Sequence, residues 1–233
     1  GMKQYAEQKY QVHVNSFFVK PACVDMELFQ PFSEKKVEQQ REKLLMKDKI
    51  ICVYAGKIGG IYLKQEIFDF FKTAFDFWGD KFRVLMLTNT SLEEIEKYIN
   101  QSNLPENIVI NKFVNHNEVP AYMAIADFAI NPVKSVPTKR YCTSIKDGEY
   151  WAMGLPIVIT KNISDDSDII FENKIGAVIQ FLDFKGYKNA IEIIDELLKD
   201  KNKIELKNKI RETANKYRSY RIAENIYASI YKN

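Results

Sequence analysis

Residues 141–160 read YCTSIKDGEYWAMGLPIVIT and predict a short helix followed by a buried strand. Ser144 is a favourable N-cap, a helical turn or two follows from Glu149 to Met153, and Gly154 is a typical C-cap. A proline two residues later prevents the helix from continuing. The next residues, Ile157-Val158-Ile159, are apolar and β-branched, which is typical of a parallel strand buried on both faces.

Two charged side chains belong to this predicted helix. Lys146 and Glu149 are three residues apart and therefore share one helix face. They could form a surface ion pair, which contributes little to stability. They could also hold a ligand at the carboxyl edge of the sheet, where open α/β folds bind ligands. These residues alone leave both interpretations open.

Strand and helix patterns alternate along the rest of the chain. We expect a strand and glycine-rich turn over 49–60 and further strands at 82–87, 107–114, 127–132, 157–159 and 176–181, with a strand-like segment at 15–21. Helices are expected over 2–11, 36–46, 62–78, 90–100, 118–126, 187–199, 203–217 and 221–232, with Thr90 and Glu93 as a capping box. This alternation predicts an α/β fold, a Rossmann-like open parallel sheet of about six strands with helices on both faces and C-terminal helices.

Composition excludes several classes of protein. The chain has 233 residues and a net charge of +3, from 34 basic and 31 acidic side chains, so no strongly basic field indicates a nucleic-acid partner. Three cysteines without CxxC spacing and two histidines without an HxxxH pattern argue against a zinc site and favour a reduced, cytosolic setting. No apolar run approaches about 18 residues, so no membrane span is predicted.

The glycine-rich turn after the first strand is the first candidate site. Gly56-Lys57-Ile58-Gly59-Gly60 has neither the GxGxxG nor the GxxxxGK[ST] spacing. Glycines between a strand and a helix still allow backbone N–H groups to approach an anion, and Lys57 and Lys64 would add positive charge. An ordinary tight turn with solvated lysines is an equally good interpretation.

Three other features have a structural and a functional interpretation. Glu149 could simply favour the helix dipole, or it could accept hydrogen bonds from the two hydroxyls of a ribose. His116 follows the third expected strand, and a lone loop histidine is more often inert than catalytic. The acidic run 165–168 could ligate a metal, but Asp and Ser in that position are more typical of a helix cap.

Four segments, in this order, resemble the C-terminal, donor-binding half of a GT-B glycosyltransferase of the family-4 or group 1 type. Residues 21–31, PACVDMELFQP, resemble the family's inter-domain element, and residues 54–60 with Lys64 resemble its phosphate-binding turn. Residues 113–122, FVNHNEVPAY, resemble the loop on the base side. Residues 144–158, SIKDGEYWAMGLPIV, resemble the most specific motif, PxKxxEYxAxGxPVV.

The resemblance implies a role for each matching residue. Lys57 and Lys64 would neutralise the donor diphosphate and the charge that grows on the leaving nucleotide, and Glu149 would hold the ribose hydroxyls. The remaining implied donor contacts are the turn glycines, the backbone on the base side and the loop that faces the phosphates and sugar, namely Gly56, Gly59, Gly60, Phe113, Val114, Ser144, Ile145 and Lys146. No metal and no cofactor is implied beyond the nucleotide-sugar substrate.

Two residues depart from the family pattern. The first carboxylate of the family's Glu-x7-Glu pair would fall at position 141, where this chain has Tyr141, so the contacts to the donor sugar are in doubt. The arginine usual in the first turn is Lys57 here, and a lysine cannot make the planar two-point contact with phosphate.

The resemblance also implies an incomplete enzyme. Residues 1–31 would be a remnant of the N-terminal domain with the inter-domain linker, and residues 32–233 the donor-binding domain. The acceptor, a glycan or lipid-linked sugar, would bind mainly to the missing N-terminal half, so transfer by this chain alone is not expected. A cytoplasmic location is implied, and attachment to the inner membrane face through the missing half stays open. The alternative is a non-catalytic Rossmann-like nucleotide-binding or regulatory module.

Overall fold

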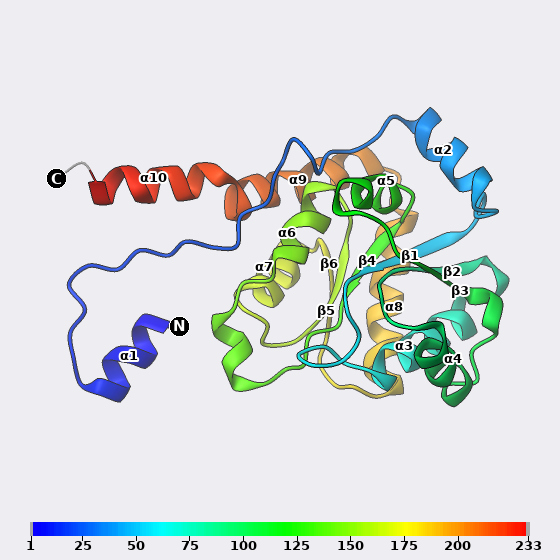
Figure 1. The fold of residues 1–233 in the computed structure, drawn as a ribbon, viewed down its shortest axis with the longest axis horizontal. Coiled ribbons are helices and arrows are strands. Elements are labelled where there is room, and N and C mark those ends of the chain that lie inside the picture. Colours follow the sequence, from blue (N-terminus) through cyan, green and yellow to red (C-terminus); the bar gives the residue numbers. More distant parts are fainter. Residues whose placement is uncertain (1, 232–233) are drawn as a thin grey trace.

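The computed structural model describes residues 2–231, and these contain a six-stranded sheet in the order β3-β2-β1-β4-β5-β6 (Figure 1). Every neighbouring pair of strands is parallel. The strands are β1 (Ile50–Ala55), β2 (Phe82–Leu87), β3 (Val109–Lys112), β4 (Phe128–Asn131), β5 (Ile157–Thr160) and β6 (Gly176–Ile179). The α/β fold class and the parallel sheet predicted from the alternating pattern are therefore confirmed.

Helices cover both faces of the sheet, and the strands are mostly buried except for the edge strand β3. One core lies between the sheet and α3 (Gln65–Trp78), α4 (Leu92–Gln101) and α8 (Phe184–Lys199). The other lies between the sheet and α5 (Val119–Met123), α6 (Ile145–Ala152), α7 (Asp166–Asn173) and α9 (Lys203–Arg218). Alternate residues of β1 point into the two cores, as a strand's period of two requires.

The strand order reverses between β1 and β4. From β1 the chain continues outward through β2 to β3, and it then returns to β4 on the other side of β1 and continues to β6. In open α/β sheets, ligands bind outside the carboxyl ends of the strands at such a switch point. The loop after β1 and the loop that leads into α6 both leave this edge, so the two predicted site segments start from neighbouring strands.

Several boundaries differ from those expected. No strand forms over 15–21, where Phe17, Phe18 and Val19 are exposed and find no strand to pair with among the described residues. The helix cap before α4 is Ser91, whose Oγ accepts a hydrogen bond from the N–H of Glu94 at 3.3 Å, and not Thr90. Local spacing could not distinguish these two adjacent hydroxyl residues.

The acidic run 165–168 also behaves differently from a simple cap. Asp165 occupies the N-cap position of α7 but makes no capping hydrogen bond through its side chain. Asp166 is completely buried and pairs with Arg218 at the end of α9. Within residues 2–231, no group of three or more His, Cys, Asp or Glu side chains is placed to hold a metal ion.

The two ends of the described chain lie outside the packed layers. α1 (Met2–Tyr10) buries no residue, and α10 (Tyr220–Tyr231) buries only Ala223 and extends away from the sheet (Figure 1). α2 (Glu34–Lys43) lies at the periphery and buries no residue. The expected end of the last helix at Lys232 falls outside the described residues. None of the helices in 2–231 is long and apolar enough to cross a membrane.

The segment between α1 and α2 docks onto the body at one point. The N–H of Val24 donates to the carbonyl of Arg218 at 2.8 Å, and Val24 and Phe29 are almost completely buried in the core. Asp25 begins the expected single turn, because its Oδ1 accepts from the N–H groups of Glu27 and Leu28. Residues 23–29 therefore pack with the rest of this chain, and the predicted boundary at residue 31 stays a prediction.

Candidate functional site

The loop after β1 turns sharply at its glycines. Gly56, Gly59 and Gly60 have φ values of +147°, +80° and +61°, a region that residues with a Cβ rarely adopt. The N–H of Gly56 donates to the carbonyl of Leu87 on β2 at 2.9 Å, and the N–H of Ala55 donates to the Tyr150 hydroxyl of α6 at 2.9 Å. The turn over 55–60, called here the first turn, is thus tied directly to α6.

Lys146 brings positive charge from α6 to the first turn. Its Nζ lies 3.8 Å from the centroid of the Tyr62 ring and 4.8 Å from that of Tyr54, which are cation–π distances. A Cβ at position 56 would overlap the Lys146 ammonium, so only glycine leaves room for it there. Burial lowers the pKa of Lys146 to about 8, although the charges of Asp147 and Glu149 oppose the shift.

Three more lysines surround the first turn. Lys57 belongs to it and is exposed, and its carbonyl accepts a 2.5 Å hydrogen bond from the Tyr54 hydroxyl. The Lys64 side chain passes close to Gly59, where a Cβ would lie 2.7 Å from its Cε. Lys134, which follows β4, donates from Nζ to the carbonyl of Gly60 at 2.9 Å. The structure therefore concentrates positive charge around exposed backbone at the carboxyl end of β1.

Glu149 is a buried carboxylate without a partner. Its residue is only 8% exposed, and no hydrogen bond to its side chain forms within the described part of the chain. Burial raises its pKa to about 7, against the opposing charge of Lys146. A buried carboxylate that lacks a donor is costly to keep ionised. Such a group is suited to accept hydrogen bonds from a ligand that brings its own hydroxyls.

The two residues expected on the base side lie farther along the sheet edge. Phe113 and Val114 directly follow β3, and Phe113 is 71% exposed while Val114 packs against the core. β3 is separated from β1 by β2, a spacing of about 10 Å between the outer pair of strands. They share the carboxyl edge of the sheet with the first turn, two strands away from it.

The amino end of α6 lies close to the first turn. Ser144 occupies the N-cap position without a capping hydrogen bond, because its Oγ instead accepts from the Nδ2 of Asn131 at 3.0 Å. Ile145 is half exposed. Tyr150, Trp151, Met153 and Leu155 are buried in the core, as expected.

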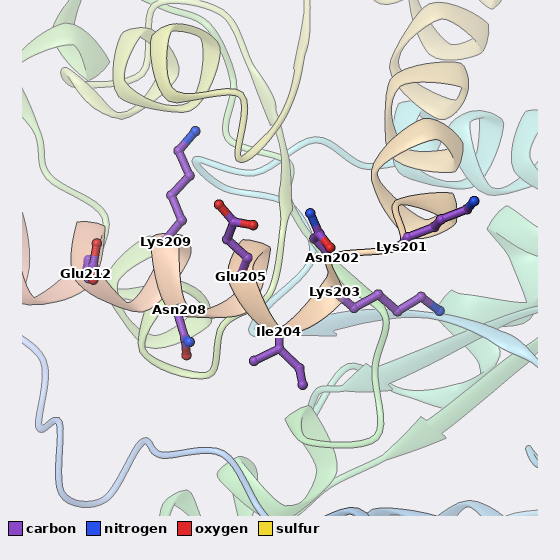
Figure 2. Close-up of a pocket in the computed structure, with 8 residues that line it drawn as sticks. All are labelled: Lys201, Asn202, Lys203, Ile204, Glu205, Asn208, Lys209 and Glu212. Atoms are coloured by element: carbon purple, nitrogen blue, oxygen red, sulfur yellow. The ribbon is translucent and has the colours of Figure 1, made fainter.

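A separate hollow lies at the start of α9 (Figure 2). No predicted site residue lines it, and its walls come from one end of α9 and the turn before it. The lining side chains are mostly charged and belong to Lys201, Asn202, Lys203, Ile204, Glu205, Asn208, Lys209 and Glu212. Opposite charges alternate along this helix and spread outward in Figure 2, so the hollow is a solvated helix surface.

The family model for group 1 glycosyl transferases matches residues 51–200. This range begins within β1, includes the first turn and all of α6, and covers well over half of the chain. The chain belongs to this family. The family's GT-B fold contains two Rossmann-like halves, and the present sheet corresponds to the C-terminal one. No curated protein matches the chain.

Solved structures share this fold at low sequence identity. A glycosyltransferase from Rickettsia africae has a TM-score of 0.77 at 17% identity, over 100% of this chain and 62% of its own. HepE from Anabaena, crystallised with UDP-glucose, has a TM-score of 0.71 at 14% identity, over 91% of this chain and 56% of its own. The C-terminal domain of LpcC, a group 1 glycosyl transferase from Francisella tularensis, has a TM-score of 0.59 at 17% identity, over 88% of this chain and 98% of its own.

The structure adds residues that sequence reasoning missed. Tyr54, Tyr62 and Lys134 contact Lys146 or the first turn. Tyr54 was part of the predicted turn segment without a role of its own, and Tyr62 and Lys134 were not predicted to belong to the site. Tyr54 directly precedes the turn and Lys134 follows a strand end, so position along the sheet edge was the available signal. Their contacts depend on tertiary packing, which spacing along the sequence does not report.

Proposed function

We propose that the chain is the donor-binding half of a glycosyltransferase and binds a nucleotide-diphosphate sugar between the first turn and α6. The observation that carries this proposal is the position of Lys146. Its ammonium lies against Gly56 and between two tyrosine rings, while Glu149 stands one helical turn further along the same helix. We propose that the lysine serves the diphosphate and the glutamate the ribose of one nucleotide.

The lysines would bind the diphosphate. Lys57 and Lys64 flank the turn, and Lys146 approaches it from α6. The backbone N–H groups of Gly59 and Gly60 would add donors that need no side chain, whereas that of Gly56 is already bonded to Leu87 and Gly56 instead leaves room for Lys146. Charge that develops on the leaving nucleotide would be stabilised by the same ammonium groups, which are held in place before the reaction. We therefore propose that no metal ion is required.

Glu149 would accept hydrogen bonds from the two ribose hydroxyls. Its buried and unpartnered carboxylate gains two donors when such a ligand binds, which offsets the cost of its burial. HepE was crystallised with UDP-glucose, and this supports a nucleotide sugar as the ligand class. Phe113 and Val114 would meet the base, and Ser144 and Ile145 the phosphates and sugar.

We infer that transfer needs more than this chain. The structures that it resembles extend well beyond the region it covers, with 62% and 56% of their lengths matched. The acceptor, a glycan or a lipid-linked sugar, would bind to the N-terminal half of a GT-B enzyme. The chain by itself is proposed to bind the donor without transferring the sugar.

Titration calorimetry with UDP, GDP and UDP-glucose tests the donor site. We expect at least one of them to bind with a Kd below about 1 mM, and Glu149→Gln to weaken binding by about tenfold, or 1.4 kcal/mol. Glu96→Gln is the matched control, because Glu96 is exposed on α4 and far from the first turn in sequence.

Two results would contradict the proposal. A folded chain that binds none of the three compounds at millimolar concentration has no donor site. If a nucleotide binds equally well to wild type and Glu149→Gln, the chain binds it elsewhere, as a non-catalytic nucleotide-binding module would.

A further inference from the structure

A cluster of charged and polar side chains is buried directly behind α6. Asn131, Asp147 and Asp166 are completely buried, and Arg218 is only 4% exposed. They come from four elements, the end of β4, the first turn of α6, the start of α7 and the end of α9. Asp147 lies between Lys146 and Glu149 in the sequence, so the cluster is attached to the helix that carries both proposed donor contacts.

Hydrogen bonds from this cluster hold the amino end of α6 at two of its residues. The Asn131 Nδ2 donates to the Ser144 Oγ at 3.0 Å and to the Asp147 Oδ1 at 2.7 Å. The Asp166 carboxylate is paired with Arg218 through Oδ1, and the nearby backbone N–H of Ser144 opposes the rise that burial causes in its pKa. β4 is thus hydrogen-bonded to the residue at which α6 begins, and the first residue of α7 lies close to it.

The carboxyl groups of Asp147 and Asp166 form a pair within this cluster. They lie close enough for each to shift the pKa of the other. The Oδ2 atoms of both are buried and, within residues 2–231, find no donor on any other side chain or backbone group. Two ionised carboxylates cannot share a hydrogen bond, and Arg218 supplies only one positive charge for the pair. A proton held between the two carboxyl groups would give both Oδ2 atoms a partner and would remove one of the two negative charges.

Asp147 is the better candidate to hold this proton. Burial, followed by the charge of Asp166, raises the pKa of Asp147 well above its usual range. Burial also raises the pKa of Asp166, but the charge of Arg218 and the N–H of Ser144 oppose that shift. The charge of Asp147 in turn acts to raise the pKa of Lys146 and Tyr150, both on α6, and that of Tyr62 beyond the first turn.

The Arg218 side chain adds tight packing to the cluster. Gly148 lies directly on it, since a Cβ there would come within 3.1 Å of the Arg218 Cγ, and the Trp151 ring centroid is 5.3 Å from its guanidinium carbon. Buried ion pairs are often less stabilising than well-packed apolar side chains of the same size. The burial of these three ionisable residues therefore indicates that they serve to position α6 more than to stabilise the fold.

We propose that Asp147, Asp166 and Arg218 are positioning residues, a proton-sharing network that sets the amino end of α6 and with it Lys146 and Glu149 against the first turn. This inference rests on the donor site proposed above. Because Asp147 is completely buried, its effect on a nucleotide passes through the position of Lys146 and Glu149. Loss of the shared proton would leave two adjacent negative charges beneath that helix.

The shared proton can be observed without any ligand. Carbon-13 NMR of the aspartate side-chain carboxyl groups at about pH 7 should show one protonated aspartate in the wild type, and Asp147→Asn should lack that signal. The proposal is overturned if every aspartate is ionised at this pH, or if the protonated signal persists in Asp147→Asn.

The positioning role is tested by two substitutions of the same residue. In Asp147→Asn the side-chain oxygen can accept from Asn131 and the amide can donate to Asp166, so the amide signals of residues 144–149 should move little and UDP affinity should stay within about twofold. Asp147→Leu fills the space but forms neither hydrogen bond. It should shift those signals and weaken UDP binding by about tenfold.

Asp76→Asn is the control, because Asp76 is an exposed residue of α3 that pairs with Lys72. A folded Asp147→Leu variant with wild-type amide signals and wild-type UDP affinity overturns the proposal. If the wild type binds no nucleotide, the donor site is refuted instead, while the carboxyl and amide signals still decide for or against the network.

Discussion

Burial brings the pKa values of both Lys146 and Glu149 close to neutral pH. Burial lowers the pKa of the lysine to about 8 and raises that of the glutamate to about 7. A lysine and a glutamate are normally both fully charged at neutral pH. With these shifts, each side chain titrates near neutral pH. The interpretation of these two residues as a surface ion pair is wrong, because neither is freely solvated and no ion pair between them is formed within residues 2–231.

These two pKa values predict a bell-shaped pH dependence of nucleotide binding. Below about pH 7 the Glu149 carboxyl is protonated and accepts hydroxyl donors less well, and above about pH 8 Lys146 loses the charge that attracts a diphosphate. UDP affinity measured from about pH 5 to about pH 10 should therefore peak between them. A flat profile would show that neither group contacts the ligand. Glu149→Gln should remove only the rise on the acid side.

Glu149 should also destabilise the free protein. A carboxyl group whose folded-state pKa is raised makes the folded state lose stability as pH rises from its unfolded pKa of 4.5 to about 7, because only the unfolded state releases the proton there. Glu149→Gln should therefore increase the free energy of unfolding by about 1–3 kcal/mol at pH 8 and change it little at pH 4. Urea denaturation at the two pH values measures this difference. Equal effects at both would mean that its carboxylate is not desolvated.

Among the elements, the first turn is the one whose geometry excludes ordinary residues. Gly56 and Gly60 both have positive φ, but a Cβ at Gly56 would overlap Lys146, whereas a Cβ at Gly60 meets nothing within 4 Å. Gly56→Ala and Gly60→Ala should each cost about 1 kcal/mol of stability from backbone strain. Only Gly56→Ala should also weaken UDP binding, because it displaces Lys146. Calorimetry with UDP on both variants measures binding, and thermal unfolding measures the loss of stability separately. Equal UDP affinities of Gly56→Ala and Gly60→Ala would contradict the proposed contact of Lys146 with the nucleotide.

The elements that the sequence predicts well are those with a buried apolar pattern. β2 and the strand at 157–160 follow from the apolar runs 84–87 and 157–159 that they contain. α3 follows from its apolar stripe, although it begins at Gln65 and not at Tyr62. The segment at 15–21 has the same local pattern but lacks a neighbouring strand, so no strand forms. Pairing is a tertiary property, and a run of apolar residues cannot report it.

The candidate site divides in the same way. The first turn, Lys64, Lys146 and Glu149 could be predicted because they stand beside strand ends or in one recognisable motif, although their roles stay predictions. Asp166 was predicted to be a cap, and its partner Arg218 stands 52 residues away. A buried pair across that separation leaves no spacing signal, so the network behind α6 is visible only in the folded chain.

At the scale of the whole molecule, one short segment joins the linker region to the site. Val24 hydrogen-bonds to the carbonyl of Arg218, whose side chain reaches Asp166 and the amino end of α6. A path of direct contacts therefore leads from residues 23–29 to the helix that carries Lys146 and Glu149. From this packing we expect residues 23–29 to unfold together with the sheet.

Two deletions should therefore have different effects on stability. No residue of 2–20 is buried, so removing them should change the free energy of unfolding by less than about 0.5 kcal/mol. Removing residues 2–31 also takes away Val24 and Phe29 from the core and should cost several kcal/mol, because truncating a buried Phe alone typically costs about 3–5 kcal/mol. Urea denaturation of the two shortened chains gives the comparison, with Phe29→Ala and Phe17→Ala in the full chain as matched buried and exposed substitutions. If both deletions unfold at the wild-type urea concentration, residues 21–31 contribute nothing to this core and belong with the preceding segment, as the predicted boundary at residue 31 has it.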